Sequence, residues 1–156
     1  MLSHDCDFIL LVNSLESSLF SPGCCKSVKL SATGEAAEKN IGFLGSYEYI
    51  GSRKDILSKE MTLGLGGPYT GWKEGSAVFR SRSSTDRNEN YEYNYLYRHI
   101  AGTWHVSTII GGEGEGVIKS VDTADCPDSI SQWQYLLNTG TILDNPWQSG
   151  DITVKC

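Results

Sequence analysis

The segment YEYNYLYR, residues 91–98, contains the clearest signal of secondary structure in the chain. Tyrosine occupies every second position, and polar residues and one leucine lie between the tyrosines. Side chains of a β-strand alternate between the two faces of a sheet, so this period of two predicts a strand with one aromatic face. Ala101-Gly102 predicts a turn, and the alternation resumes over residues 104–109. The two runs together predict a β-hairpin.

Shorter runs of the same kind occur on both sides of this hairpin. Strands are expected over residues 28–31, 43–50, 77–79, 117–121 and 151–155, whereas residues 130–137 fit a helix or a strand. Glycines and prolines mark turns between several of these runs. Many short strands with frequent turns predict a mainly β domain, built as an antiparallel sandwich or a barrel-like sheet.

The first 23 residues differ from the rest of the chain. Their apolar side chains recur at helical spacing, and Pro22-Gly23 ends the pattern, so one short amphipathic helix is expected there. These apolar residues are Phe8, Leu11, Val12, Leu15 and Leu19. We therefore divide the chain into an N-terminal amphipathic segment, residues 1–23, and a disulfide-linked β domain, residues 24–156.

The composition excludes several classes of protein. A chain of 156 residues is one ordinary domain. Its 13 basic and 19 acidic residues give a net charge of -6, which argues against nucleic acid and anionic membranes as partners. No apolar run approaches the 18 residues of a membrane span, so none is expected.

The cysteines predict an oxidising compartment. Cys24 and Cys25 open the β domain, while Cys126 and Cys156 lie late in it. Adjacent cysteines do not easily bond each other, so we expect bonds from this pair to Cys126 and Cys156, with the connectivity left open. Cys6 is left over, and the alternative is a set of reduced, buried thiols in a cytosolic protein.

Disulfides predict an extracellular, secreted protein. Residues 1–23 do not have the regions of a standard signal peptide. Either the chain is a fragment, or the predicted localisation is wrong.

Aromatic residues are the first candidates for a ligand-binding site. Tyr91, Tyr93, Tyr95 and Tyr97, joined across the hairpin by Trp104, are expected to form an aromatic surface for a protein or a glycan. The alternative is that these rings pack in a core, with their hydroxyls at its edge. Trp72 and Trp147 occur in turn-like contexts and are candidates for exposed recognition residues.

Acidic residues and histidines are weaker candidates. Glu113, Glu115, Asp122 and Asp125 suggest a Ca²⁺ site, against the alternative of a solvated turn, and no other cofactor is expected. His99 and His105 flank the predicted turn and are expected to face each other across the hairpin. A metal site there needs further ligands, and the alternative is two ordinary histidines.

Short motifs spread over residues 24–156 form a further pattern. They are Cys-x-x-Val near the start, Ser-x-Thr-Gly-Glu-Ala-Ala (31–37), Leu-Gly-x-Tyr (44–47), Val-Phe-Arg (78–80), Tyr-Leu-Tyr (95–97), Trp-His-Val (104–106), Cys-Pro (126–127) with a later Trp, and a final Val-x-Cys. Together they resemble a disulfide-bonded module of extracellular, often multidomain proteins of invertebrates and lower chordates. The resemblance implies a secreted module and carries over no catalytic residue.

These observations predict a non-enzymatic extracellular module for binding, adhesion or assembly. It is expected to contact protein or glycan through aromatic side chains, as a lectin-like protein does. One alternative is a structural subunit that self-assembles into an extracellular filament or other assembly. The other is a hydrolase whose site is assembled from scattered residues such as His99 or His105.

Overall fold

A computed structural model describes residues 24–52, 76–82, 93–110, 116–137 and 146–156 of the chain. The described residues form one antiparallel sheet with the order β8-β7-β6-β5-β4-β3-β2-β1-β9. The strands are β1 (Ser27–Ala32), β2 (Gly45–Ser52), β3 (Ala77–Arg82), β4 (Tyr93–Arg98), β5 (Thr103–Ser107), β6 (Ile118–Thr123), β7 (Trp133–Leu136), β8 (Trp147–Gly150) and β9 (Ile152–Lys155). The predicted mainly β, antiparallel fold is confirmed.

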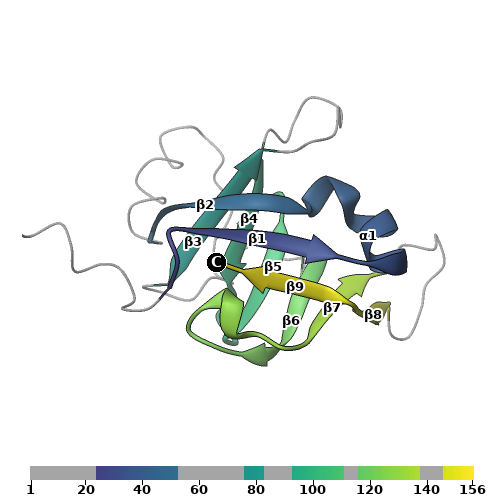
Figure 1. Ribbon diagram of the computed structural model, residues 1–156. Helices are drawn as coiled ribbons and strands as arrows, with labels where there is room; N and C mark the ends of the chain where they lie inside the picture. The colour runs from purple at the N-terminus through teal and green to yellow at the C-terminus, as the bar shows by residue number, and fades with distance from the viewer. Residues whose placement is uncertain (1–23, 53–75, 83–92, 111–115, 138–145) are drawn as a thin grey trace, which may run out of the picture.

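The last two strands close this sheet into a nearly complete barrel. β8 pairs with β7 at one edge and β9 pairs with β1 at the other, yet only Asp151 separates β8 from β9. The two edges must therefore meet at this residue, and the sheet curls around to allow it (Figure 1). Thr33 holds the bend, because its N–H and its hydroxyl donate to the Asp151 carbonyl and carboxylate at 3.0 and 2.6 Å. The barrel-like alternative is thus the observed one.

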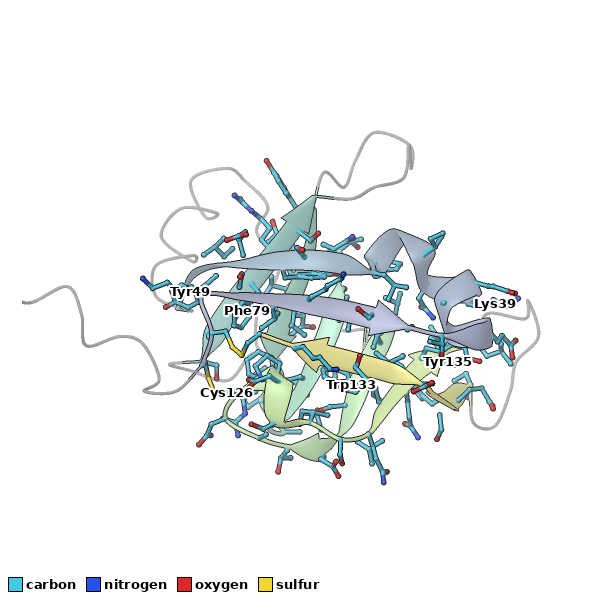
Figure 2. All side chains as sticks on the ribbon, in the orientation of Figure 1. Lys39, Tyr49, Phe79, Cys126, Trp133 and Tyr135 are labelled. Atoms are coloured by element: carbon cyan, nitrogen blue, oxygen red, sulfur yellow. A yellow bond between two sulfur atoms is a disulfide. The ribbon has the colours of Figure 1, made fainter. Side chains whose placement is uncertain are left out.

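The interior of the barrel contains the main hydrophobic core. Cross-strand partners on the inner face run from Phe79 through Leu96 and Val106 to Ile118, and all four side chains are buried. Trp104 and Trp133 are the largest side chains of this core. Figure 2 shows Trp133 and Phe79 among the side chains that point into the barrel. This alternation of inner and outer positions follows from the pleat of each strand.

A short helix and a single helical turn lie beside the bend. The helix α1 spans Gly34–Asn40 and the turn η1 spans Ile41–Phe43. Phe43 is buried in the core, and its carbonyl accepts a hydrogen bond from the Tyr47 hydroxyl at 2.6 Å. The Asn94 side-chain amide donates to the Gly42 carbonyl at 2.8 Å, which ties β4 to the same turn. The amphipathic helix expected over residues 1–23 lies outside the described residues.

Two disulfides join distant parts of the chain. Cys24 bonds to Cys126 and Cys25 bonds to Cys156, with Cα–Cα distances of 5.3 and 5.6 Å. The predicted set of partners is confirmed, and the structure supplies the connectivity. Together the bonds fasten the start of β1 to the end of β9 and to the segment around η3 (Pro127–Ser129). Two disulfides are compatible with an extracellular location.

One element differs from what the local sequence suggests, and one alternative that it left open is decided. Trp147, predicted to lie in a turn, is the first residue of β8, because pairing with Leu136 extends its backbone. Residues 133–136, which fit either a helix or a strand, form β7 between β6 and β8. Within the described residues, no helix has the length and apolar character needed to span a membrane.

We predict that Gly150→Ala destabilises the barrel by about 1–3 kcal/mol, because an added methyl group overpacks the bend. A Cβ at this position would lie 2.9 Å from Tyr135 Cδ1 and 3.0 Å from Ala36 Cβ. Urea denaturation of both proteins measures the effect. Ser149→Ala at the exposed neighbouring position is the control, and equal loss of stability in the two variants would contradict the close approach.

We also predict that buried tyrosine makes the fold sensitive to alkaline pH. Burial raises the pKa of Tyr47 above its ordinary value of 10.0. Desolvation, and then the charge and hydrogen bond of Glu35, raise the pKa of Tyr135 in the same direction. A tyrosine whose pKa is raised by folding stabilises the protein below pH 10, and this stability is lost as the pH rises further.

Tyr47→Phe tests this dependence. At pH 7 the variant is expected to be less stable by roughly 1 kcal/mol, because the hydrogen bond to Phe43 is lost. The difference in stability between the wild-type protein and the variant should narrow between pH 9 and pH 11. Only the wild-type protein loses stability in this range, because phenylalanine does not ionise. Thermal unfolding across this range measures it, with Tyr93→Phe at a partly buried tyrosine as the control. A gap that stays constant with pH would argue against the desolvated hydroxyl.

The disulfide connectivity gives a third prediction. Replacing Cys24 and Cys126 together by serine should leave the Cys25–Cys156 bond intact and lower stability by about 3–4 kcal/mol, the chain-entropy value for the loop of roughly 30 residues that this bond closes while the other is present. Mass spectrometry without reduction, after free thiols are blocked, detects the remaining bond. Finding Cys25 and Cys156 blocked in this variant would contradict the pairing.

Candidate functional site

A row of side chains crosses the outer face of the sheet. Tyr97 is opposite His105, His105 is opposite Lys119, and Lys119 is opposite Gln134, so all four share one face. Tyr97 and His105 are buried, whereas Lys119 and Gln134 are half-buried. The row therefore changes from an aromatic, covered end on β4 to a polar, accessible end on β6 and β7.

The accessible end of the row lines a groove of about 330 Å³. The lining residues are His99, Ala101, Thr103, His105, Lys119, Ser120, Val121 and Gln134. Ala101 is exposed and Val121 is 45% exposed, so the groove is open to solvent at its rim. Six of the eight side chains can form hydrogen bonds, which is the mixture expected of a site for a polar ligand.

The two histidines stack in this groove, as predicted from their positions around the turn. Their ring centroids are 4.7 Å apart and their planes differ by 8°. The Ala101 N–H donates to Nδ1 of His99 at 3.2 Å, and Nε2 of His105 lies 2.9 Å from the Thr103 hydroxyl. Nitrogen lone pairs lie in the ring planes, so parallel stacked rings do not direct two nitrogens at one metal ion. The pair is a flat, polar surface and does not form a two-histidine metal site in this arrangement.

The turn between these histidines depends on Gly102. The His99 N–H donates to the Thr103 carbonyl at 2.7 Å, and the Gly102 N–H donates back to the His99 carbonyl at 2.8 Å. Gly102 has a φ of +96°, a conformation that other residues rarely adopt. The turn predicted at Ala101-Gly102 is therefore the element that places His99 over His105.

Lys119 connects the groove to Trp147. Its Nζ lies 4.1 Å from the centroid of the Trp147 ring, a cation–π contact. Lys119 is an outward position of β6, between the buried residues Ile118 and Ser120. Trp147, the first residue of β8, thus contacts the groove residue Lys119 from outside the groove lining.

The tyrosines of β4 belong mainly to a second hydrophobic cluster. Tyr95 and Tyr97 are buried against Val78 and Ile110, as the core interpretation predicts. Tyr93 is half-buried, and the Arg80 guanidinium lies 4.3 Å above its ring. Tyr91 and Trp72 lie outside the described residues. The described part of the chain therefore offers Tyr93 as the accessible ring of this face.

Trp104 does not extend the tyrosine face, so its predicted place was wrong. It is opposite Arg98, whereas Tyr97 is opposite His105, so the hairpin register places Trp104 on the inner face. The ring is fully buried, and its Nε1–H donates to the Ala124 carbonyl at 2.9 Å. Register across a turn depends on turn length, which single-strand alternation does not contain.

The described acidic residues of the predicted calcium site form structural contacts. Asp125 accepts a charged hydrogen bond from Arg98 at 2.8 Å, and Asp122 accepts one from the Ser131 hydroxyl at 2.8 Å. Glu113 and Glu115 lie outside the described residues. The Ca²⁺ site therefore stays a prediction.

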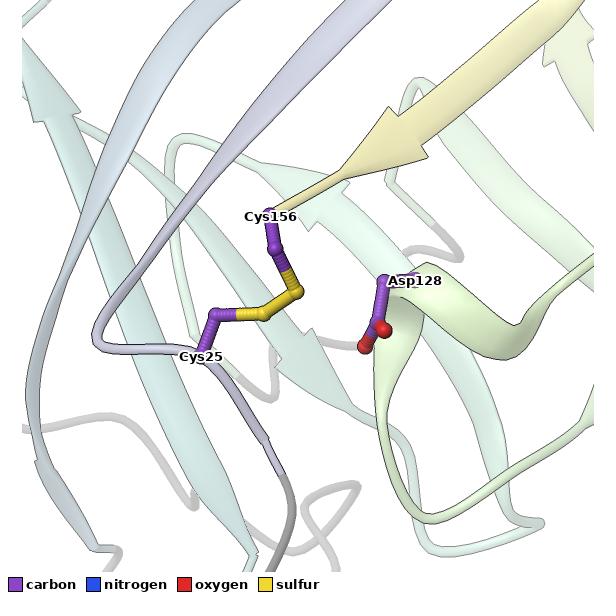
Figure 3. A group of neighbouring side chains, drawn as sticks. All are labelled: Cys25, Asp128 and Cys156. Atoms are coloured by element: carbon purple, nitrogen blue, oxygen red, sulfur yellow. A yellow bond between two sulfur atoms is a disulfide. The ribbon is translucent and has the colours of Figure 1, made fainter.

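One further cluster has the composition of a metal site. Cys25, Cys156 and Asp128 place one ligand atom each within 4.8 Å of one another, and Figure 3 shows the Asp128 side chain beside the disulfide. Both sulfur atoms are already bonded to each other, and thiolates are the form of cysteine that binds metals. While the disulfide is formed, the cluster does not supply the ligands of a thiolate metal site.

Sequence reasoning missed Lys119 and Gln134 as site residues. The signal for Lys119 was weak, because in the predicted strand 117–121 it shares one face with Val117 and Val121. Gln134 had no comparable signal, since residues 130–137 fit either a helix or a strand. Pairing between β6 and β7 is what places the two side chains together.

Comparison with known proteins adds no assignment. No family model, no curated protein and no solved structure matches this chain. Function is therefore inferred from the residues and geometry described above.

Proposed function

We propose that this chain is a non-enzymatic, disulfide-bonded extracellular module that binds a saccharide in the groove over β5, β6 and β7. The groove itself is the observation that carries the proposal. Its polar side chains project from paired strands of a nearly closed barrel, so their positions are held before any ligand arrives. Such preorganisation lowers the entropic cost of binding.

The size and lining of the groove favour a saccharide over a protein surface. A volume of about 330 Å³ lies at the lower end of small-ligand sites. A stable protein interface needs roughly 800 Å² on each partner, which is far wider than this groove. The lining combines hydrogen-bonding groups with the flat imidazole stack, a combination that suits the hydroxyls and the apolar face of a sugar ring.

The same lining argues against the hydrolase alternative. A glycosidase uses a pair of carboxyl groups, and the residues that line the described groove include no aspartate or glutamate. The Ser120 hydroxyl accepts from the Trp104 N–H at 2.9 Å and donates to the Asp122 carbonyl at 2.7 Å. A serine nucleophile donates its hydroxyl proton to a neighbouring base. The Ser120 proton is donated to a backbone carbonyl instead, so these bonds give Ser120 a structural role.

The two disulfides and the short motifs support the extracellular part of the proposal. The motifs resemble a module of secreted, multidomain proteins, and the Cys24–Cys126 and Cys25–Cys156 bonds suit an oxidising compartment. Adhesion through glycans of a neighbouring surface is the role that this combination suggests. A structural subunit is the alternative class, and light scattering distinguishes it by a mass far above 17.1 kDa.

Blocking the groove tests the proposal. Ala101→Trp adds a bulky ring to an exposed turn at the groove rim and is expected to reduce saccharide binding at least tenfold (about 1.4 kcal/mol). Binding of the fluorescently labelled protein to an array of oligosaccharides measures the effect. Ile41→Trp is the matched control, because Ile41 is 68% exposed on η1 and does not line the groove.

Thermal unfolding confirms that each variant is folded. Failure of the wild-type protein to bind any oligosaccharide at millimolar concentration would contradict the proposal. Unchanged binding by Ala101→Trp would instead show that the saccharide binds elsewhere on the molecule.

A further inference from the structure

We infer that the saccharide is acidic, and that Lys119 binds its carboxylate or sulfate group. This inference rests on the proposed function, and it adds the chemical class of the ligand. Three features of the groove support it: the sign of its charge, the position of the Lys119 amine, and the hydrogen-bond donors beside that amine.

The charge of the groove is opposite to that of the chain. The whole sequence has a net charge of -6, yet the described residues of the lining are one lysine, two histidines and five uncharged residues. A site of this sign within an acidic protein attracts an anion locally, while the remaining surface repels one. Binding of an acidic sugar is therefore directed to the groove.

The Lys119 amine is held in place before a ligand binds. A lysine side chain has high rotamer entropy, and fixing it on binding opposes affinity. The contact of Nζ with the Trp147 ring at 4.1 Å reduces this freedom, and it leaves the positive charge in place. Trp147 thus acts as a positioning residue for the ammonium group.

The other groups of the groove are well supplied with donors. The Ala101 N–H occupies Nδ1 of His99, so a neutral His99 ring carries its proton on Nε2 and offers an N–H donor. Gln134, opposite Lys119 on the same face, has a side-chain amide with two N–H donors and one carbonyl acceptor. A carboxylate or sulfate accepts hydrogen bonds only, whereas a sugar hydroxyl also donates. The ammonium of Lys119 and Nε2–H of His99 are donors alone, so they match an oxyanion.

Matched ligands test the inference. Lactose, 3′-sulfolactose and 3′-sialyllactose share a disaccharide and differ in the acidic group. Isothermal titration at 50 mM sodium chloride is expected to show each acidic ligand bound about tenfold more tightly than lactose, the size of one charge-assisted contact. The difference should shrink at 300 mM sodium chloride, because salt screens a solvent-accessible charge pair.

Substitution of the lysine separates charge from shape. Lys119→Gln is expected to weaken binding of the acidic ligands about tenfold more than binding of lactose, and so to remove the preference for them. Lys155→Gln is the matched control, because Lys155 is exposed on β9 and lies outside the groove lining. Trp147→Leu should weaken the preference without abolishing it, since the lysine charge remains.

The outcomes separate this inference from the proposed function. Binding of lactose and its acidic derivatives with equal affinity would contradict the inference alone. Absence of binding by any saccharide would contradict the proposed function and this inference with it. Tight binding of a glutamate-rich peptide or of free sulfate, without binding of the acidic sugars, would show that the anionic ligand is not a saccharide and would contradict both proposals.

Discussion

Closure of the sheet at Asp151 is the constraint on which the rest of the structure depends. A single short run of chain pairs with β7 before this residue and with β1 after it. β8 and β9 are the two edge strands of the sheet, and the bend at Asp151 brings these two edges together at one point. Closure also makes one face into an interior, and this interior buries both Trp104 and Trp133.

The disulfides and the bend stabilise the barrel at different places. Thr33 binds Asp151 where β8 turns into β9, while Cys25–Cys156 fastens the far end of β9 to the start of β1. Cys24–Cys126 adds the segment around η3. Both strands at the closure are only four residues long. Bonds at both ends of this short closing element limit its fraying, since terminal segments otherwise open first.

Most of the groove lies on paired strands of the barrel. Tyr97 and Val78 form a buried layer on the outer face, and His105 packs beside Tyr97 with ring centroids 6.0 Å apart. His99 stacks on His105 in turn, so the groove is supported from below by the second hydrophobic cluster. Side chains on paired strands hold their geometry better than side chains on loops. Tyr97, one of the tyrosines predicted to contact a ligand, instead lies buried beside His105, on which His99 stacks.

The sequence by itself determined the β class, the strands other than β7 and β8, and the set of bonded cysteines, because alternation is a local pattern and the cysteines bracket the domain. It also placed His99 and His105 on either side of a turn. Only the tertiary structure decided that Trp104 faces inward, that Lys119 lies over Trp147, and which cysteine of the pair bonds to which partner. Alternation distinguishes two faces of a strand but does not say which is the interior. Register and closure settle that choice, and both depend on contacts between residues far apart in the chain.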